Sequence, residues 1–288
     1  MGRDAWLGGV HQAIREEISY LETQFAPSIA ALGTLQLSVA VVALGRRPDP
    51  WTRQDDGLHL MAAFSVALDH LVILVEDLDA VSGAFAREGF TVTPRTEHSA
   101  EMGTANRCVM LEGVYLELLA IIRPTERNSG WRELLASGGG VRGIALRSSD
   151  LADTARRLEA HHVPASPVLS FSRQADEATL RFSVIRVDRT ATPGMQLLAC
   201  QHHTPELLWR PEWCRHGNGT RALRHASIPA ADPTGTATLL SLFPATAATE
   251  CEVELTPTEG PATLGLISDS RRDIDLAGLC GLRLELRS

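Results

Sequence analysis

Short apolar runs that lead into a polar turn recur three times along this chain. They are DHLVILVEDLDA (69–80), RGIALRSSDLAD (142–153) and RHASIPAADPTG (224–235). A short run of this kind, bounded by a turn, predicts a β-strand. In each turn an aspartate stands where its side chain can cap the first turn of a following helix: Asp77, Asp150 and Asp232.

Each of these starts continues with a helical pattern and three more strand-like segments. The helices are predicted within 80–90, 151–163 and 235–243. The strands are predicted at 90–94, 106–113 and 115–121, then at 166–172, 180–187 and 195–201, and finally at 251–257, 262–268 and 282–288. A βαβββ module is therefore predicted three times, over 68–124, 140–203 and 222–288. The expected fold class is α+β.

The first part of the chain has a different pattern. Apolar residues at helical spacing cover 5–25, and a run without charge follows at 28–45. That run has the length of a short membrane span, but its Ser, Thr, Gln and Gly residues dilute it, and it does not suit a secretory signal. We expect residues 1–65 to be an extension, helical or poorly ordered, with Met61 as a candidate natural start. A membrane helix remains the less favoured alternative.

The remaining chain divides into two expected domains. Residues 66–220 would hold the first two modules, and residues 221–288 the third. The third module rests on a shorter similarity than the other two.

Composition and charge restrict the classes of function. The chain of 288 residues has a formal net charge of −8, which argues against a nucleic-acid partner. All 27 basic residues are arginine, so lysine chemistry such as a Schiff base or a Walker-A phosphate site is excluded. The five cysteines form no CxxC pair, which favours reduced thiols in a cytoplasmic protein.

Two polar residues interrupt apolar strands in the first module. His70 stands at the head of a Leu, Val and Ile run, and Glu117 stands between two leucines. A lone strand histidine is usually a hydrogen-bonded core residue. A carboxylate between leucines, however, needs a polar cavity or a partner, because burying it unpaired is costly. We therefore expect both side chains to line a pocket.

These features resemble a known superfamily. The βαβββ repeat, His70 and YLELLA (115–120) are similar to the vicinal oxygen chelate superfamily, which includes glyoxalase I, extradiol dioxygenases and bleomycin-resistance proteins. GTAN (103–106) and QHHTPELLWRPEW (201–213) resemble its glyoxalase-like domain proteins more narrowly. The resemblance covers about residues 66–220. It implies curled mixed sheets in which two modules together form a cup around one divalent metal ion.

The resemblance also implies which positions would hold the metal. Ligands of this fold come from the first and fourth strands of each module, which in module one hold His70 and Glu117. In module two the offset from Asp150 places Gly143 opposite His70. Matching MQLLAC with YLELLA places Gln196 opposite Glu117. Gly143 has no side chain, so half of the site would be incomplete.

Module three offers a second pair. The same offset from its aspartate reaches His225, and matching RLELRS with YLELLA reaches Glu285. Two histidines and two glutamates would suit Zn, Fe, Mn, Co or Ni. Chain order nevertheless favours the pairing of module one with module two. The odd third module could also complete its cup against a second subunit in a homodimer.

Further residues are candidates for substrate contact or catalysis. Strand alternation places His202 on the same face as Gln196, where it could act as a base. The GTAN segment contributes Thr104 and Asn106, and His98 lies shortly before it. Trp209 begins the segment WRPEW (209–213), which we expect to form an aromatic strap. The expected function is a metal-dependent lyase, isomerase or hydrolase acting on a small substrate with vicinal oxygens. A metal-free binding or resistance protein that uses the same cup is the alternative.

Overall fold

The computed structural model describes residues 63–175, 178–243, 251–257 and 259–288. The chain divides into two units, Met1–Asp49 and Pro50–Ser288, and the described residues all lie in the second. The expected helix at 5–25 and the charge-free run at 28–45 therefore fall outside the described residues. Among the residues described, no helix has the length and apolar character needed to cross a membrane.

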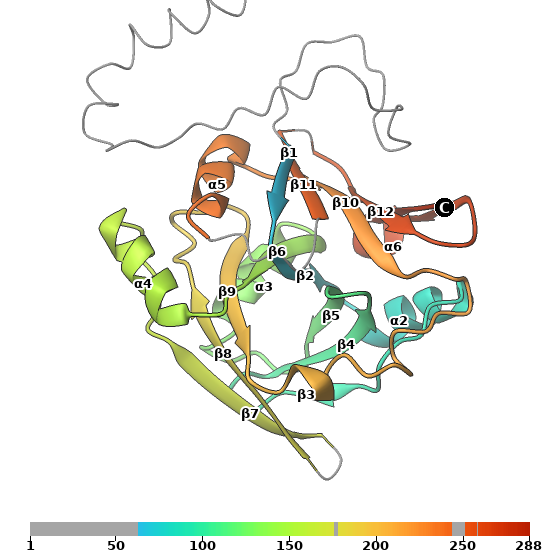
Figure 1. The fold of residues 1–288 in the computed structure, drawn as a ribbon, viewed down its shortest axis with the longest axis horizontal. Helices are drawn as coiled ribbons and strands as arrows, with labels where there is room; N and C mark the ends of the chain where they lie inside the picture. The colour runs from blue at the N-terminus through green and yellow to red at the C-terminus, as the bar shows by residue number, and fades with distance from the viewer. Residues whose placement is uncertain (1–62, 176–177, 244–250, 258) are drawn as a thin grey trace, which may run out of the picture. The chain divides into compact units, whose positions relative to one another are not determined.

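The first two predicted modules form one eight-stranded sheet, whose strands curl around a common centre (Figure 1). Module one comprises β2 (Leu68–Leu74), α2 (Leu78–Arg87), β3 (Thr96–Glu97), β4 (Thr104–Met110) and β5 (Tyr115–Ile121). Module two comprises β6 (Gly140–Arg147), α4 (Leu151–Ala160), β7 (Leu169–Ala175), β8 (Ala178–Arg186) and β9 (Gln196–His202). An additional helix, α3 (Ser129–Ala136), connects the modules.

The strand order β3-β4-β5-β2-β6-β9-β8-β7 gives the two modules the same internal pairing. In each module the first strand pairs in parallel with the last, β2 with β5 and β6 with β9. The first strands of the two modules pair with each other in antiparallel fashion, with Leu71 opposite Ile144. Chain order therefore does decide the pairing: module one closes the cup with module two.

The predicted aspartate caps organise both module helices. The Asp77 side chain accepts hydrogen bonds from the backbone N–H groups of Asp79 and Ala80, and Asp150 accepts from Ala152 and Asp153. Such caps satisfy N–H groups that otherwise have no partner in the first helical turn. They hold each helix directly after its first strand.

The third predicted module forms a separate sheet of different topology. Its elements are β10 (Ala222–Pro229), α5 (Pro233–Leu240), β11 (Cys251–Thr256), β12 (Ala262–Ile267), β13 (Arg272–Leu276), α6 (Ala277–Cys280) and β14 (Leu282–Arg287). The strand β1 (Ala63–Val66) joins this sheet from the start of the described chain, and a 3₁₀ turn, η1 (Pro205–Leu207), lies between β9 and β10. The strand order is β1-β11-β10-β12-β14-β13. Here β10 pairs with β11 and β12 rather than with the last strand.

This topology differs from the expected third repeat because two more strands take part. The segment 272–276 forms an edge strand, β13, whose charged residues hide its alternation from a search for apolar runs. Strand β1, which precedes the first module, pairs with β11. The equivalence of His225 to His70, which assumed the same module, therefore has no structural basis.

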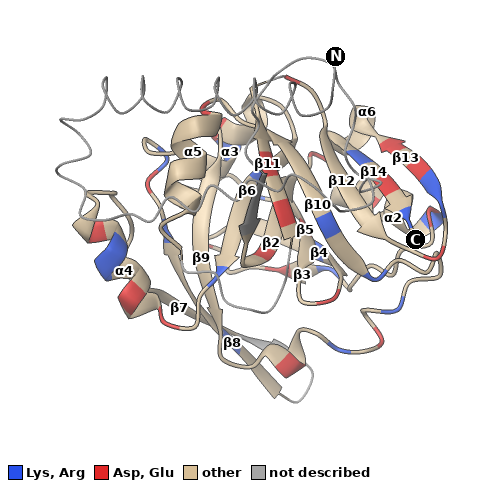
Figure 2. Ribbon diagram, turned by 45° about the horizontal axis from the view of Figure 1, so that its top comes forward, with Lys and Arg blue, Asp and Glu red and all other residues tan. Residues whose placement is uncertain are grey.

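One apolar core joins the second sheet to the back of the cup. Leu71 and Ile73 of β2 belong to the same buried cluster as Ala226 of β10 and Leu284 of β14. The opposite face of the second sheet carries charged residues, which Figure 2 shows along β10, β11, β13 and β14. Alternation of buried and more exposed residues, as in β11 and β14, is typical of a sheet with one packed and one polar face. The concave face of the first sheet is thus left to line a cavity.

Candidate functional site

A bulge in the first strand of the cup brings two neighbouring residues into one site. Leu68 pairs with Leu146 and His70 with Ala145, so Asp69 is an extra residue without a partner position. A β-bulge of this kind bends the strand and redirects side chains. The His70 Nδ1 atom lies 2.8 Å from the Asp69 Oδ1 atom. The bulge therefore lets a carboxylate hold the histidine beside it.

Asp69 is the centre of a buried polar network. Its Oδ1 atom lies 3.0 Å from His202 Nε2, and its Oδ2 atom accepts a hydrogen bond of 3.1 Å from Arg147 Nε. The side chain is fully buried. Burial alone would raise the pKa of Asp69, but the hydrogen bonds with His202 and His70 outweigh it and hold this pKa well below its usual range. Asp69 is therefore a fixed negative charge.

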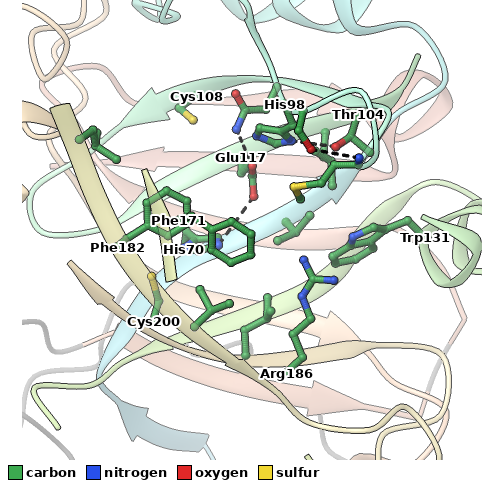
Figure 3. Close-up of a pocket in the computed structure, with 18 of the residues that line it drawn as sticks. His70, His98, Thr104, Cys108, Glu117, Trp131, Phe171, Phe182, Arg186 and Cys200 are labelled. Carbon is green, nitrogen blue, oxygen red and sulfur yellow. Dashed lines mark hydrogen bonds and ion pairs between the residues drawn. The ribbon is translucent and has the colours of Figure 1, made fainter. Parts of the chain in front are cut away.

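Glu117 and His70 face each other across the concave surface. Their Oε2 and Nε2 atoms are 3.7 Å apart, and Glu117 Oε1 accepts a hydrogen bond of 2.5 Å from Asn106 Nδ2 (Figure 3). The Tyr115 ring stacks on the His70 imidazole with 4.5 Å between centroids. Since Asp69 holds the Nδ1 atom, the Nε2 atom of His70 is directed toward Glu117.

These residues line a cavity of about 340 Å³. This volume lies in the range of small-molecule sites, about 300 to 1,000 Å³. Module one supplies most of the polar lining, including His70, Glu117, Asn106, Thr104 and His98. Module two supplies five apolar side chains and four polar or titratable ones: Phe171, Leu180, Phe182, Val184 and Leu198, and Ser172, Arg186, Cys200 and His202. The connecting helix α3 adds Trp131.

The strand register shows which residues of module two correspond to His70 and Glu117. His70 pairs with Tyr115, and its counterpart Gly143 pairs with Gln196, so Gln196 corresponds to Tyr115. Leu198, two residues later, corresponds to Glu117. The match of MQLLAC with YLELLA was therefore displaced by two residues. Gln196 itself donates hydrogen bonds to the backbone oxygens of Val187 and Leu197 and does not line the cavity.

The position of Gly143 has no space for a ligand side chain. A Cβ atom there would lie 2.9 Å from Val72 Cβ and 3.2 Å from Trp131 Cη2. Trp131 occupies the volume into which a module-two ligand would extend, and Leu198 packs in the same apolar cluster. A metal site built from two ligands of each module therefore does not fit this cup.

A different group of side chains has donor atoms suitable for a metal. Asp69, Cys200 and His202 place one oxygen, one sulfur and one nitrogen within 4.8 Å of one another. This combination is chemically suited to Zn²⁺. The same His202 Nε2 atom already contacts Asp69, so an ion would have to replace that hydrogen bond.

The remaining predicted site residues are distributed between the rim, the strap and the second sheet. His98 Nδ1 lies 2.7 Å from Thr104 Oγ1 at the rim of the cavity. Trp209 does not line the cavity. Its ring packs edge-on against His202 and beneath the Arg147 guanidinium, so the strap covers the buried network from outside.

His225 and Glu285 are not brought to the cup. They lie on β10 and β14 of the second sheet, where His225 Nε2 is 3.6 Å from Glu254 Oε2. Glu285 lies 3.5 Å from Arg287. The two residues occupy the polar face of that sheet, away from the apolar core that separates it from the cup.

Sequence reasoning missed three charged residues of the site. Asp69 immediately precedes His70, but regular alternation would have directed it to the core. Arg147 and Arg186 each stand at the end of an apolar strand. The argument applied to His70 and Glu117, that a charged residue in such a strand needs a partner or a cavity, would also have selected Arg186.

Comparisons with known proteins agree with this fold. Residues 68–243 match a family described as a glyoxalase-like domain. A hypothetical protein from Staphylococcus aureus is 11% identical with a TM-score of 0.58, and the match covers 76% of this chain and 99% of that one. Methylmalonyl-CoA epimerase from Mycobacterium tuberculosis is 22% identical over 50% of this chain and 93% of its own, with a TM-score of 0.38. A search of curated proteins finds no match.

Proposed function

Because this chain belongs to the glyoxalase-like domain family of the vicinal oxygen chelate superfamily, we propose that its cup moves a proton on a small carbonyl substrate. The observation that carries this proposal is the facing pair of His70 and Glu117 in the cavity. A carboxylate and an imidazole within reach of one bound molecule form a general acid–base pair. The reaction would be of the isomerase or lyase type.

Each polar group around the pair has a role in this proposal. Glu117 takes a proton from the carbon next to a carbonyl group, and the electron pair moves onto the carbonyl oxygen. A second hydrogen of Asn106 Nδ2, or His70 Nε2 when it carries a proton, stabilises that oxygen. On an α-hydroxy ketone, Glu117 returns the proton to the former carbonyl carbon while the hydroxyl proton of the intermediate passes to the other oxygen, which completes the isomerisation. Asp69 is a positioning residue, because it orients the His70 ring.

The test is exchange of substrate hydrogen with solvent. A panel of α-hydroxy ketones, 1,2-diketones and β-keto acids is incubated with the protein in D₂O, and deuterium incorporation is followed by NMR. Glu117→Gln is expected to slow exchange by about 10²- to 10⁴-fold. The control is Glu159→Gln, on the exposed side of α4, which should exchange at the wild-type rate.

Two results would reject the proposal. One is equal exchange by the wild type and Glu117→Gln. The other is the absence of exchange on every compound while some of them bind, which would favour a binding or resistance protein. The apolar side chains of module two support that alternative, since Phe171, Phe182 and Leu198 offer contact area to a ligand.

A divalent metal is the second candidate, and the Asp69, Cys200 and His202 group favours it. An ion held by these residues would polarise a substrate carbonyl. Elemental analysis of protein purified with added metal and without chelator tests this arrangement. We expect His202→Ala to lose the ion and His225→Ala to retain it. Substoichiometric metal in the wild type would reject a resident ion.

A further inference from the structure

Arg186 is a charged residue of the cup that the proposed proton transfer does not use. Its side chain extends from the end of β8 into the cavity (Figure 3). Its Nε atom is buried and has no hydrogen-bond partner among the residues that the structure describes. No ion pair of Arg186 is found within the same residues. By contrast, Asp69 contacts Arg147 and His202, and Glu117 accepts a hydrogen bond from Asn106.

A half-buried arginine whose Nε atom is buried without a partner needs an explanation. Burial lowers the pKa of Arg186, Glu117 opposes this effect, and Arg127 adds to it. An arginine side chain nevertheless keeps its charge in proteins. Leaving such a charge without an anion is costly, and the cost is recovered when a ligand supplies one. The cavity therefore holds a cation prepared for an anionic group.

The register of the eight-stranded sheet places Arg186 three strands away from His70, on the opposite side of the cavity from the His70 and Glu117 pair. Arg186 pairs with Leu198, Leu198 with Ala145, and Ala145 with His70. Three steps of about 4.8 Å make roughly 14 Å along the sheet, and the curl shortens the straight path. A ligand that reaches both ends would carry its anionic group several bonds away from the reacting carbonyl.

The walls and charges define the rest of the ligand. Phe171, Phe182 and Trp131 offer aromatic surfaces to its middle part. Three carboxylates line the cavity beside the two arginines Arg127 and Arg186, namely Glu97, Glu101 and Glu117, and this excess of negative charge disfavours a doubly charged phosphate. The Arg186 guanidinium is instead matched by a carboxylate, which its planar fork can bind through two parallel hydrogen bonds.

We propose that Arg186 is the carboxylate-binding residue of this cup, and that the ligand is a monocarboxylic acid with an apolar or aromatic body. The proposal rests on the proposed function for the position of the reacting group, but not for the binding of the acid. In this proposal Arg186 selects the ligand by binding its carboxylate, whereas Glu117 removes a proton from the bound ligand.

The test compares two probes of the same shape, phenylbutyrate and phenylbutyramide, by titration calorimetry. The wild type is expected to bind the acid roughly ten- to a hundredfold more tightly than the amide, as for a hydrogen bond to a charged group. Arg186→Gln should bind both probes equally, and Arg186→Lys should keep part of the preference. The control is Arg181→Gln, on the exposed side of β8, which should keep all of it.

The outcomes separate this proposal from the previous one. Equal binding of acid and amide by the wild type, binding of neither probe, or an unchanged preference in Arg186→Gln would overturn the role of Arg186. Deuterium exchange could still occur in each of these cases. Conversely, a preference for the acid that survives in Glu117→Gln, with no exchange by the wild type, would leave Arg186 in place and reject the proton transfer.

Discussion

The two halves of the cup have the same backbone and opposite chemistry. Module one presents His70 and Glu117 at the positions where module two has Gly143 and Leu198. The difference lies in a few side chains, since strand pairing and helix capping are the same in both. A repeated fold therefore does not require a repeated site. In the proposed function, module one supplies the pair that moves a proton, and module two supplies most of the surface that contacts the ligand.

The largest change in the free energy of unfolding is expected for Asp69, the buried charge on which the polar network of the cup depends. Asp69→Ala leaves Arg147 and the two histidines without their common acceptor, and breaking a buried charged network typically costs about 3 to 5 kcal/mol. Urea unfolding measures this change. Asp79→Ala provides the control, because Asp79 is exposed and its ion pairs with Arg95 and Arg107 should contribute at most about 1 kcal/mol.

The same charge predicts a dependence on pH. The pKa of Asp69 is lower in the folded protein than in the unfolded chain, so its contribution to stability is complete above about pH 4 and decreases as the pH falls further. The gap in unfolding free energy between wild type and Asp69→Ala should narrow in acid. A constant gap between pH 6 and pH 2.5 would contradict the assignment of Asp69 as the buried anion.

A smaller change in the free energy of unfolding is expected for Gly143, the module-two position that has no space for a side chain. Gly143→Ala places a methyl group 2.9 Å from Val72 Cβ, and overpacking of this kind costs about 1 to 3 kcal/mol. Val72→Ala removes the Cγ2 atom at 3.0 Å but keeps the Cβ atom at 2.9 Å. In that background only part of the cost should disappear, which a double-mutant cycle measures. Gly278→Ala is the control, since a Cβ there meets no atom within 4 Å. Equal stability of wild type and Gly143→Ala would show that module two still has space for a ligand.

Parts of this comparison were predictable from the sequence, and the reasons differ by residue. The capped helices and most strands of the cup followed from local signals at Asp77 and Asp150, but the strand predicted at 90–94 does not form and the short β3 follows it. Asp69 did not, because a bulge is a property of strand pairing that regular alternation cannot reveal. Gln196 was misplaced because similarity of letters was used where the register of β6 and β9 decides. The order of the second sheet depends on pairings between distant segments, such as β1 with β11.

A smaller effect of opposite sign is expected at Arg186. If this residue is retained to bind a ligand, then replacing it should remove a half-buried charge whose Nε atom has no partner among the described residues. Arg186→Met is expected to raise the free energy of unfolding by about 1 kcal/mol while removing the preference for the acid. Arg181→Met, on the exposed side of β8, should stay within about 0.5 kcal/mol of the wild type. A strong destabilisation by Arg186→Met would indicate a structural role instead.

The smallest effect is expected on the second sheet. His225 and Glu285 match His70 and Glu117 in local sequence, yet they lie on a polar sheet face, where the His225 contact to Glu254 is 3.6 Å and partly exposed. The double variant His225→Ala, Glu285→Gln should change stability by no more than about 0.5 kcal/mol. It should also leave deuterium exchange and acid binding unchanged, because the apolar core lies between that face and the cup. Loss of either activity would mean that sequence similarity, rather than topology, identifies the working residues. Glu117→Gln should lose deuterium exchange while the double variant keeps it. This difference would locate the chemistry in the eight-stranded sheet, whose two modules share one strand order.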